Sequence, residues 1–265
     1  DNVATARALE VEIRNCGATP ALIAVLDGAI QVGLSAAQLD WLGRAQDILK
    51  LSRNDLPYAI AAGRSGATTV AATMICAHLA GIRVFATGGI GGVHRDAART
   101  FDISADLEEL ARTPVAVVCA GAKALLDLPK TLEYLETRGV PVIGYGTDEF
   151  PAFWSRSSGL RAPIRLDSPA EIAKLLRVKW DMGLSGGAVI ANPVDAAHEI
   201  PADEMETYIE GALGEAVLER VIGKAVTPFV LSRILKMTEG RSLETNIALV
   251  KSNARLAAEI AVALA

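Results

Sequence analysis

Aromatic residues and cysteines are scarce in this sequence. Aromatic side chains make up 5% of the 265 residues, and the three cysteines are Cys16, Cys76 and Cys119. The cysteines lie far apart in apolar surroundings and form no CxxC pair. We therefore expect buried, reduced thiols instead of a disulfide framework or a zinc site. This cysteine usage predicts a cytoplasmic protein.

Long apolar runs and runs of basic residues are also missing. Gly, Lys or Arg interrupts every strongly apolar segment before about 18 residues, the minimum for a membrane-spanning helix, and no signal peptide is found. The net charge is −5, from 26 basic and 31 acidic residues. Because nucleic-acid binding needs a positive footprint, we expect neither a nucleic acid nor a membrane as partner. A small phosphorylated ligand needs only local positive charge and stays open.

Apolar runs alternate with helical patterns almost from end to end. Hydrophobic residues make up 51% of the chain, which is enough for a sizeable core. The patterns predict strands at 22–26, 48–51, 82–85, 115–119, 140–145 and 186–190, and helices at 1–16, 36–45, 57–62, 67–80, 106–111, 132–137 and 168–182, with a mostly helical last seventy residues. This alternation predicts a single α/β domain over residues 1–265. Its expected architecture is a three-layer α/β/α fold around a central, largely parallel or mixed sheet.

A glycine-rich segment, ATGGIGGVHR at residues 86–95, follows the third predicted strand directly. It fits neither the GxGxxG arrangement of dinucleotide-binding folds nor the GxxxxGK[ST] loop of nucleotide triphosphatases. Glycine lets a backbone turn sharply and lets a ligand approach its N–H groups. We expect a phosphate cradle that includes Gly88 and Gly89. The neighbouring side chains suited to an anion are Thr87, His94 and Arg95.

Two lysines lie in or just after predicted strands. Lys123 comes after the run at 115–119 and three small residues, at the strand end where ligands gather in open α/β sheets. Burial there would lower its pKa and give a neutral, nucleophilic amine, whereas most lysines are solvated surface residues. Both readings stay open, and Gly121 with Lys123 is predicted to open a helix. Lys50 lies within the strand predicted at 48–51 and could meet an anion.

Two carboxylates lie close together after the glycine-rich segment. Asp102 and Asp106 flank Ser104, and one carboxylate with several waters suffices for Mg²⁺ or Mn²⁺. The alternative is that Ser104 or Asp106 caps the following helix. Asn246, in the helical C-terminal region, could bind a ligand or lie on a helix surface.

Eight blocks of the sequence, in order and with matching spacing, resemble the pseudouridine-5′-phosphate glycosidases, an indigoidine synthase A-like family. They are residues 52–57, 63–70, 86–95, 100–106, 118–123, 140–145, 164–167 and 191–193. The resemblance implies that pseudouridine 5′-phosphate and water give uracil and ribose 5-phosphate reversibly, a reaction classed formally as a carbon–oxygen hydro-lyase. The broken C–C bond has no electronegative leaving atom, so the route of ordinary glycosidases suits it poorly.

The resemblance also implies residue roles and an assembly. Lys123 forms a Schiff base with C1 of the ring-opened sugar, Asp102 holds Mn²⁺ or another divalent cation, and the family is homotrimeric. The implied substrate contacts are Lys50, Val70, Thr87, Gly88, Gly89, His94, Ser104, Ala105, Asp106 and Asn246.

The sequence departs from the family pattern at two places. The family's proton-donating glutamate lies in an N-terminal Glu-Ser-Thr segment that has no match here, and we expect that segment to be missing from this chain. Asp96 stands where the family has a glycine, which adds negative charge near the expected anion site. Two other functions therefore stay open: a related activity on another ribosyl phosphate, and phosphoribose binding with impaired or no turnover.

Overall fold

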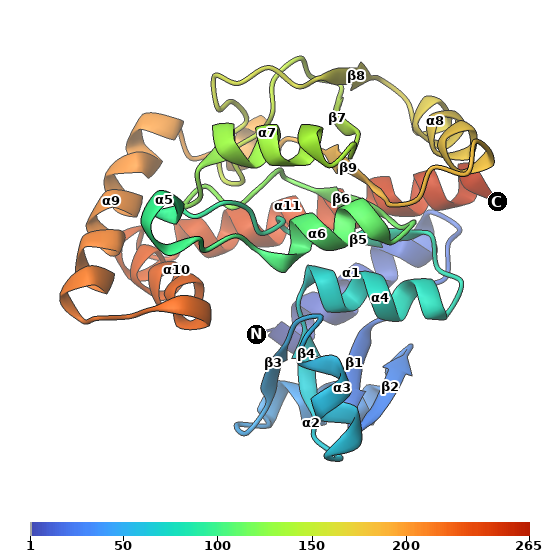
Figure 1. Ribbon diagram of the computed structural model, residues 1–265, viewed down its shortest axis with the longest axis horizontal. Coiled ribbons are helices and arrows are strands. Elements are labelled where there is room, and N and C mark those ends of the chain that lie inside the picture. The colour runs from blue at the N-terminus through green and yellow to red at the C-terminus, as the bar shows by residue number, and fades with distance from the viewer. Residues whose placement is uncertain (1) are drawn as a thin grey trace.

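The computed structural model, which describes residues 2–265, is built around two β-sheets (Figure 1). The larger sheet has the order β5-β6-β9-β7-β8, and all of its neighbouring strands run parallel. Its strands are β5 (Val84–Ala86), β6 (Ala116–Cys119), β7 (Val142–Tyr145), β8 (Ile164–Leu166) and β9 (Ala188–Ala191). Four of these five strands were expected from the sequence; β8 was not.

Helices cover both faces of the larger sheet because side chains along its strands alternate between them. Ala116 and Val118 of β6 pack in one apolar cluster with α8 (Pro169–Asp181) and α11 (Arg241–Leu264). Val117 and Cys119 pack in another, with α4 (Val70–Leu79), α6 (Ala105–Arg112) and α7 (Leu128–Thr137). All four of these β6 side chains are fully buried, which explains the unbroken apolar run. The predicted three-layer α/β/α fold is confirmed.

A smaller mixed sheet lies at one end of the molecule together with α2 (Ala36–Arg44) and α3 (Leu56–Ala61), below the larger sheet in Figure 1. Its order is β2-β1-β4-β3, with β1 antiparallel to both β2 and β4 and β3 parallel to β4. The strands are β1 (Ile23–Leu26), β2 (Ala29–Val32), β3 (Leu49–Leu51) and β4 (Gly66–Thr68). The sequence predicted β1 and β3 but not the second sheet.

The helix predicted over 67–80 was placed too early. Residues 66–68 pair with both β1 and β3, and α4 starts only at Val70, where the Thr69 side chain accepts a hydrogen bond from the Ala72 amide. Sheet pairing on two sides therefore overrides the helical composition of this segment. By contrast, α2 begins at the predicted residue, Ala36, where Ser35 and Gln38 form a capping box.

The C-terminal residues form a helical group beside the sheet. The remaining helices are α1 (Asn2–Asn15), α5 (Ala97–Thr100), α9 (Ala202–Leu218), α10 (Val226–Met237) and the short 3-10 turns η1 (Ala196–His198) and η2 (Gly223–Ala225). Helices α9 and α10 pair at the left of Figure 1, and α11 runs from there along the larger sheet to the C-terminus. None of the helices described within residues 2–265 combines the length and apolarity that crossing a membrane requires.

Helix α6 connects the two sheets through buried acids. The Glu109 side chain is 1% exposed and pairs with Arg53 of the loop after β3, at 2.5 Å between Oε2 and Nη1. One turn earlier, Asp106 of the same helix accepts a hydrogen bond from the Ala71 amide at the start of α4. Because loss of Arg53, whose side chain is 49% exposed, would leave the buried Glu109 carboxylate without its counter-charge, these contacts help to fix the small sheet against the large one.

Candidate active site

A cavity of about 650 Å³ lies where the two sheets meet. Lys50 of β3 and Thr68 of β4 line one side, and the segments that follow β5 and β6 line the other. Ligands in parallel sheets gather at the carboxyl ends of strands, which is the edge that this cavity occupies. All twelve residues to which the family resemblance gives a role line it: Lys50, Val70, Thr87, Gly88, Gly89, His94, Asp102, Ser104, Ala105, Asp106, Lys123 and Asn246.

The parallel pairing of β5 and β6 continues beyond both strands as an irregular ladder. It joins the glycine loop, defined here as residues 87–92, to residues 118–123. The four backbone hydrogen bonds are Thr87 N to Val118 O (2.9 Å), Ala120 N to Gly88 O (2.8 Å), Ile90 N to Gly121 O (3.1 Å) and Lys123 N to Ile90 O (3.1 Å). The backbone of Lys123 is thus held directly by the glycine loop.

Glycines are required in this loop because neighbouring side chains lie close to its backbone, and not because the chain turns sharply. None of the four has a φ in the left-handed region. A Cβ at Gly91 would overlap the Ser104 side chain and lie 2.7 Å from Oδ2 of Asp106, and one at Gly89 would lie 2.6 Å from the Phe153 ring. The glycines therefore allow close packing of the loop against neighbouring side chains and do not form a left-handed turn; the approach of a ligand to their N–H groups stays a prediction.

Asp106 is a buried carboxylate that holds the loop in place. Its Oδ1 accepts from the Ala71 amide at 2.9 Å and its Oδ2 from the Gly91 amide at 2.8 Å. Ser104 is the N-cap of α6 and accepts from the Asp106 amide at 3.2 Å. The capping alternative for Ser104 is confirmed. Any ligand contact of Asp106 must add to these two hydrogen bonds.

Lys123 lies in a loop and not at the start of a helix. Its amide belongs to the ladder, and α7 begins only at Leu128, after the Asp127 cap. The predicted helix start at Gly121 and Lys123 is therefore wrong, because residues 120–123 extend the sheet pairing. Burial lowers the pKa of the Lys123 amine; the Asp106 charge opposes this effect and the Lys50 charge adds to it. The amine thus becomes neutral at a lower pH than an ordinary lysine.

Asp102 and His94 face each other at the cavity wall. Nε2 of His94 lies 3.8 Å from Oδ2 of Asp102, whose side chain is 39% exposed. Within residues 2–265, no three His, Cys, Asp or Glu side chains gather into a metal-binding group. A cation at Asp102 would therefore take most of its ligands from water or from a bound phosphate, as Mg²⁺ and Mn²⁺ do.

Arg95 and Asp96 do not line this cavity. The Arg95 guanidinium binds both oxygens of Glu206 in α9, at 2.5 and 2.9 Å, and the carbonyl of Ala124 at 3.1 Å. Arg95 thus joins α9 to the loop after Lys123 and does not belong to an anion cradle in the cavity. Asp96 precedes α5 and is exposed.

Sequence reasoning assigned no role to several other residues of the cavity lining. These are Ser52 and Asn54 after β3, Phe153 in the loop after β7, and Thr227 and Leu231 of α10. Of these residues, only Phe153 is marked by the sequence, because it stands with Phe150 and Trp154 in a short aromatic group of an otherwise aromatic-poor chain. It adopts a φ of 60°, a strained conformation for an aromatic residue, and its ring packs edge-to-face on Trp154 at 4.8 Å. Nothing in the sequence around Thr227 and Leu231 of α10 indicates a role in a site.

The family model and the relatives found by comparison match this chain over nearly its whole length. The family model described as "Indigoidine synthase A like protein" matches residues 1–263. A protein of Solibacter usitatus named pseudouridine-5′-phosphate glycosidase is 70% identical over 261 residues, which cover 98% of this chain and 87% of the relative. A protein of the same name from Caldanaerobacter subterraneus subsp. tengcongensis is 57% identical over 263 residues, covering 99% and 86%.

Two solved structures share the fold. The prealnumycin C-glycosynthase AlnA in complex with ribulose 5-phosphate superposes with a TM-score of 0.93 at 37% identity, covering 98% of this chain and 86% of that one. An indigoidine synthase A-like protein of Thermotoga maritima superposes with a TM-score of 0.91, also at 37% identity and with the same coverage of both chains.

Substitution of Gly91 tests the close packing of the glycine loop. Gly91→Ala is expected to lower the free energy of unfolding by about 2 kcal/mol, because the added methyl group overpacks the site against Ser104 and Asp106. Gly214→Ala in α9 is the matched control, since a Cβ there meets nothing within 4 Å, and it is expected to be neutral or stabilising. Denaturant unfolding measures both; equal free energies for the two variants would contradict the packing argument.

Proposed function

This chain belongs to the indigoidine synthase A-like protein family, and we propose that it cleaves pseudouridine 5′-phosphate reversibly to uracil and ribose 5-phosphate. The observation that carries the proposal is one cavity that contains a partly buried amine with a lowered pKa, Lys123, together with a second cation, Lys50, and the glycine loop. Relatives at 57% and 70% identity, named for this activity, support it.

The proposed chemistry uses Lys123 as the nucleophile, because a C–C glycosidic bond offers no leaving atom that an acid can protonate easily. The sugar ring first opens: the bond from C1 to the ring oxygen breaks, the oxygen takes up a proton, and the base loses an N–H proton and forms a double bond to C1. The neutral amine then adds to C1, and the base regains its electron pair and its N–H proton. As the bond from C1 to the base breaks, its electron pair goes to the uracil carbon, which takes up a proton, and the nitrogen–carbon bond becomes an iminium. Water then hydrolyses the iminium to the aldehyde of ribose 5-phosphate and returns the free lysine. The net reaction consumes one water.

The phosphate of the substrate is proposed to lie between Lys50 and the glycine loop. Gly88 and Gly89 line the cavity, and no hydrogen bond among residues 2–265 uses their amide N–H groups. Amides aimed into a cavity are suited to phosphate oxygens, and Lys50 supplies positive charge. Amides of Ile90 and Gly91, by contrast, are already engaged with the protein.

A divalent cation, manganese in the first instance, is proposed at Asp102. The donor set fits such an ion, because a single partly exposed carboxylate at the cavity wall leaves most ligand positions to water and phosphate. When bound, the cation supplies positive charge that offsets the phosphate. His94 stands 3.8 Å from the same carboxylate and helps to orient it.

A homotrimer in the cytoplasm is also proposed. Apolar side chains at the end of α9 and before η2 are strongly exposed, among them Leu218 (83%) and Ile222 (81%), and a subunit interface would cover them. Light scattering of the purified protein should then give three times the chain mass of 27.8 kDa. The buried free thiols Cys76 and Cys119, the latter with a pKa raised by burial to about 12, suit a reducing compartment, and cell fractionation tests this location.

A related activity on another base is the second candidate function. The observation that favours it is the similarity to AlnA, a C-glycosynthase by name that was solved with ribulose 5-phosphate. Both candidates share the phosphopentose and the lysine and differ in the base. Measuring the consumption of pseudouridine 5′-phosphate separates the first candidate from the second and from a protein that binds phosphoribose without turnover.

Replacement of the nucleophile is the direct test of the proposed function. Lys123→Ala is expected to abolish uracil release, followed as the absorbance change on consumption of pseudouridine 5′-phosphate with Mn²⁺, because no other amine occupies its position on the ladder. Lys236→Ala, on an exposed position of α10, is the control and should keep full activity. Turnover retained by Lys123→Ala would reject the assignment.

The pH dependence should respond to Lys50. The Lys50 charge helps to lower the pKa of Lys123, so Lys50→Met raises that pKa and leaves less neutral amine at a given pH. The rising limb of kcat/KM against pH should therefore move to higher pH in Lys50→Met and stay in place in Lys236→Met. An unmoved limb in both variants would show that the two amines are not coupled.

The cation site should depend on Asp102. Asp102→Asn removes the only charged ligand proposed for the ion, so the Mn²⁺ concentration that restores half of the activity after EDTA treatment should rise by about tenfold or more. Lys50→Met serves as the comparison, since it changes phosphate binding without removing this carboxylate. If Asp102→Asn and the wild type need the same Mn²⁺ concentration, the cation is held elsewhere.

A further inference from the structure

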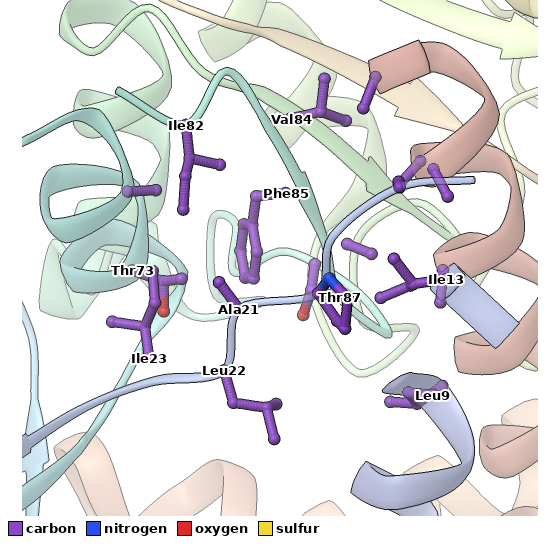
Figure 2. A pocket seen from close by; sticks show the side chains of 18 of the residues that line it. Leu9, Ile13, Ala21, Leu22, Ile23, Thr73, Ile82, Val84, Phe85 and Thr87 are labelled. Carbon is purple, nitrogen blue, oxygen red and sulfur yellow. The ribbon is translucent and has the colours of Figure 1, made fainter. Parts of the chain in front are cut away.

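The start of the glycine loop lies between two cavities. Behind it, opposite the catalytic cavity, is a largely apolar space of about 410 Å³ between α1, α4, α11 and β5. Figure 2 shows Thr87 at the edge of this space, with Phe85 and Ile82 of the preceding segment and Ile13 of α1 around it. Thr87 and Gly88 line both cavities. Both residues therefore border open space on two sides, although a Cβ at Gly88 would still lie 3.2 Å from Oδ1 of Asn246 and 3.4 Å from the Phe153 ring.

A single buried side chain of α11 secures this part of the loop. Asn253 is fully buried, and its Nδ2 donates to the Thr87 carbonyl at 2.8 Å and to the Gly88 carbonyl at 3.5 Å. Its Oδ1 accepts from Nδ2 of Asn192 at 3.0 Å. Because a carbonyl can only accept, the amide of Asn253 must point its nitrogen at the loop and its oxygen at Asn192.

Asn192 connects this side chain to the other side of β6. It follows β9 directly, its backbone N–H donates to the Cys119 carbonyl at 2.8 Å, and its Nδ2 also donates to Oγ of Ser252 at 3.0 Å. In the larger sheet, β6 stands between β5 and β9. The two amides therefore form a brace that crosses the carboxyl end of β6, where the chain leaves for Lys123.

We propose that Asn253 is a positioning residue for the Lys123 amine, an inference that rests on the proposed function. Thr87 and Gly88 are the first two residues of the ladder that ends at the Lys123 amide. Strand β5 is at the edge of its sheet, so only β6 pairs with it, and the α11 side chain supplies the second attachment. Asn253 does not line the catalytic cavity; it acts through the backbone of the loop.

An amide side chain at position 253 supplies the hydrogen-bond donor that the Thr87 carbonyl needs. A fully buried carbonyl that loses its donor costs about 1–3 kcal/mol, and an apolar side chain at 253 would impose part of that cost on the Thr87 carbonyl, whose residue is half-buried. The loop would then shift toward one of its two cavities to find another partner. A displacement of about 1 Å at the reacting atoms costs on the order of 100-fold in rate.

The test compares Asn253→Leu and Asn253→Ala with a control on the same helix. Thr245 is 3% exposed and its Oγ1 donates to the His198 carbonyl at 2.7 Å, so Thr245→Val removes one buried hydrogen bond to backbone without touching the ladder. All variants should lose thermal stability. Only the Asn253 variants should lose kcat on pseudouridine 5′-phosphate, by about 100-fold. KM should rise as well, because the shifted loop carries the Gly88 and Gly89 amides proposed to bind the phosphate, so kcat at saturating substrate is the deciding readout.

The outcomes separate this inference from the proposed function. Wild-type protein that does not consume pseudouridine 5′-phosphate overturns the proposed function and this inference with it. Active wild-type protein with an unchanged kcat in Asn253→Leu overturns the inference alone, as does an equal loss of kcat in Thr245→Val. If both Asn253 variants fail to fold, Asn192→Ala, which cuts the far end of the brace, decides: kcat should fall in the same direction, and an unchanged kcat contradicts the role.

Discussion

The hydrogen-bonded ladder between the glycine loop and residues 118–123 is the feature on which the site depends. A parallel strand pair normally ends where its strands end, but here the pairing continues irregularly and carries Lys123 into the cavity. The amine is therefore placed by backbone pairing, which is rigid, and not by the end of a helix or a free loop. Sites held by backbone hydrogen bonding keep their geometry better than sites on unpaired loops. Glycines permit this pairing because neighbouring side chains occupy the space that a Cβ would need.

Helix α6 gives the cavity its second wall. Asp106 ties the glycine loop to the start of α4, and Glu109, three residues later, ties the loop after β3 to the same helix. Residues spaced in this way lie on one face of a helix. One short helix thus sets the distance between Lys123, on the large sheet, and Lys50, on the small one. The electrostatic coupling of the two amines follows from that spacing.

Much of this could be predicted from sequence, for reasons that are local. The apolar run of β6 identified a doubly covered strand, and the position of Lys123 just beyond it identified a strand end; both signals need only neighbouring residues. The small sheet could not be predicted, because β4 is short and pairs with β1, which is distant in sequence; β2, by contrast, pairs with β1 as a local hairpin through Asp27 and Gly28. The same applies to Asn253, which meets Thr87 across 166 positions of sequence, and to the glycines, whose need for space arises from Ser104 and Phe153. A single sequence shows which residues carry chemistry more readily than which residues hold them.

Trapping the covalent intermediate tests the central claim most directly. Incubation with ribose 5-phosphate and sodium borohydride reduces any Schiff base to a stable amine, and peptide mass spectrometry locates it. The account predicts one reduced pentose phosphate on the peptide that contains Lys123, and none on that peptide in Lys123→Ala. An adduct on Lys50 in the wild type, or no adduct while pseudouridine 5′-phosphate is still consumed, would contradict it.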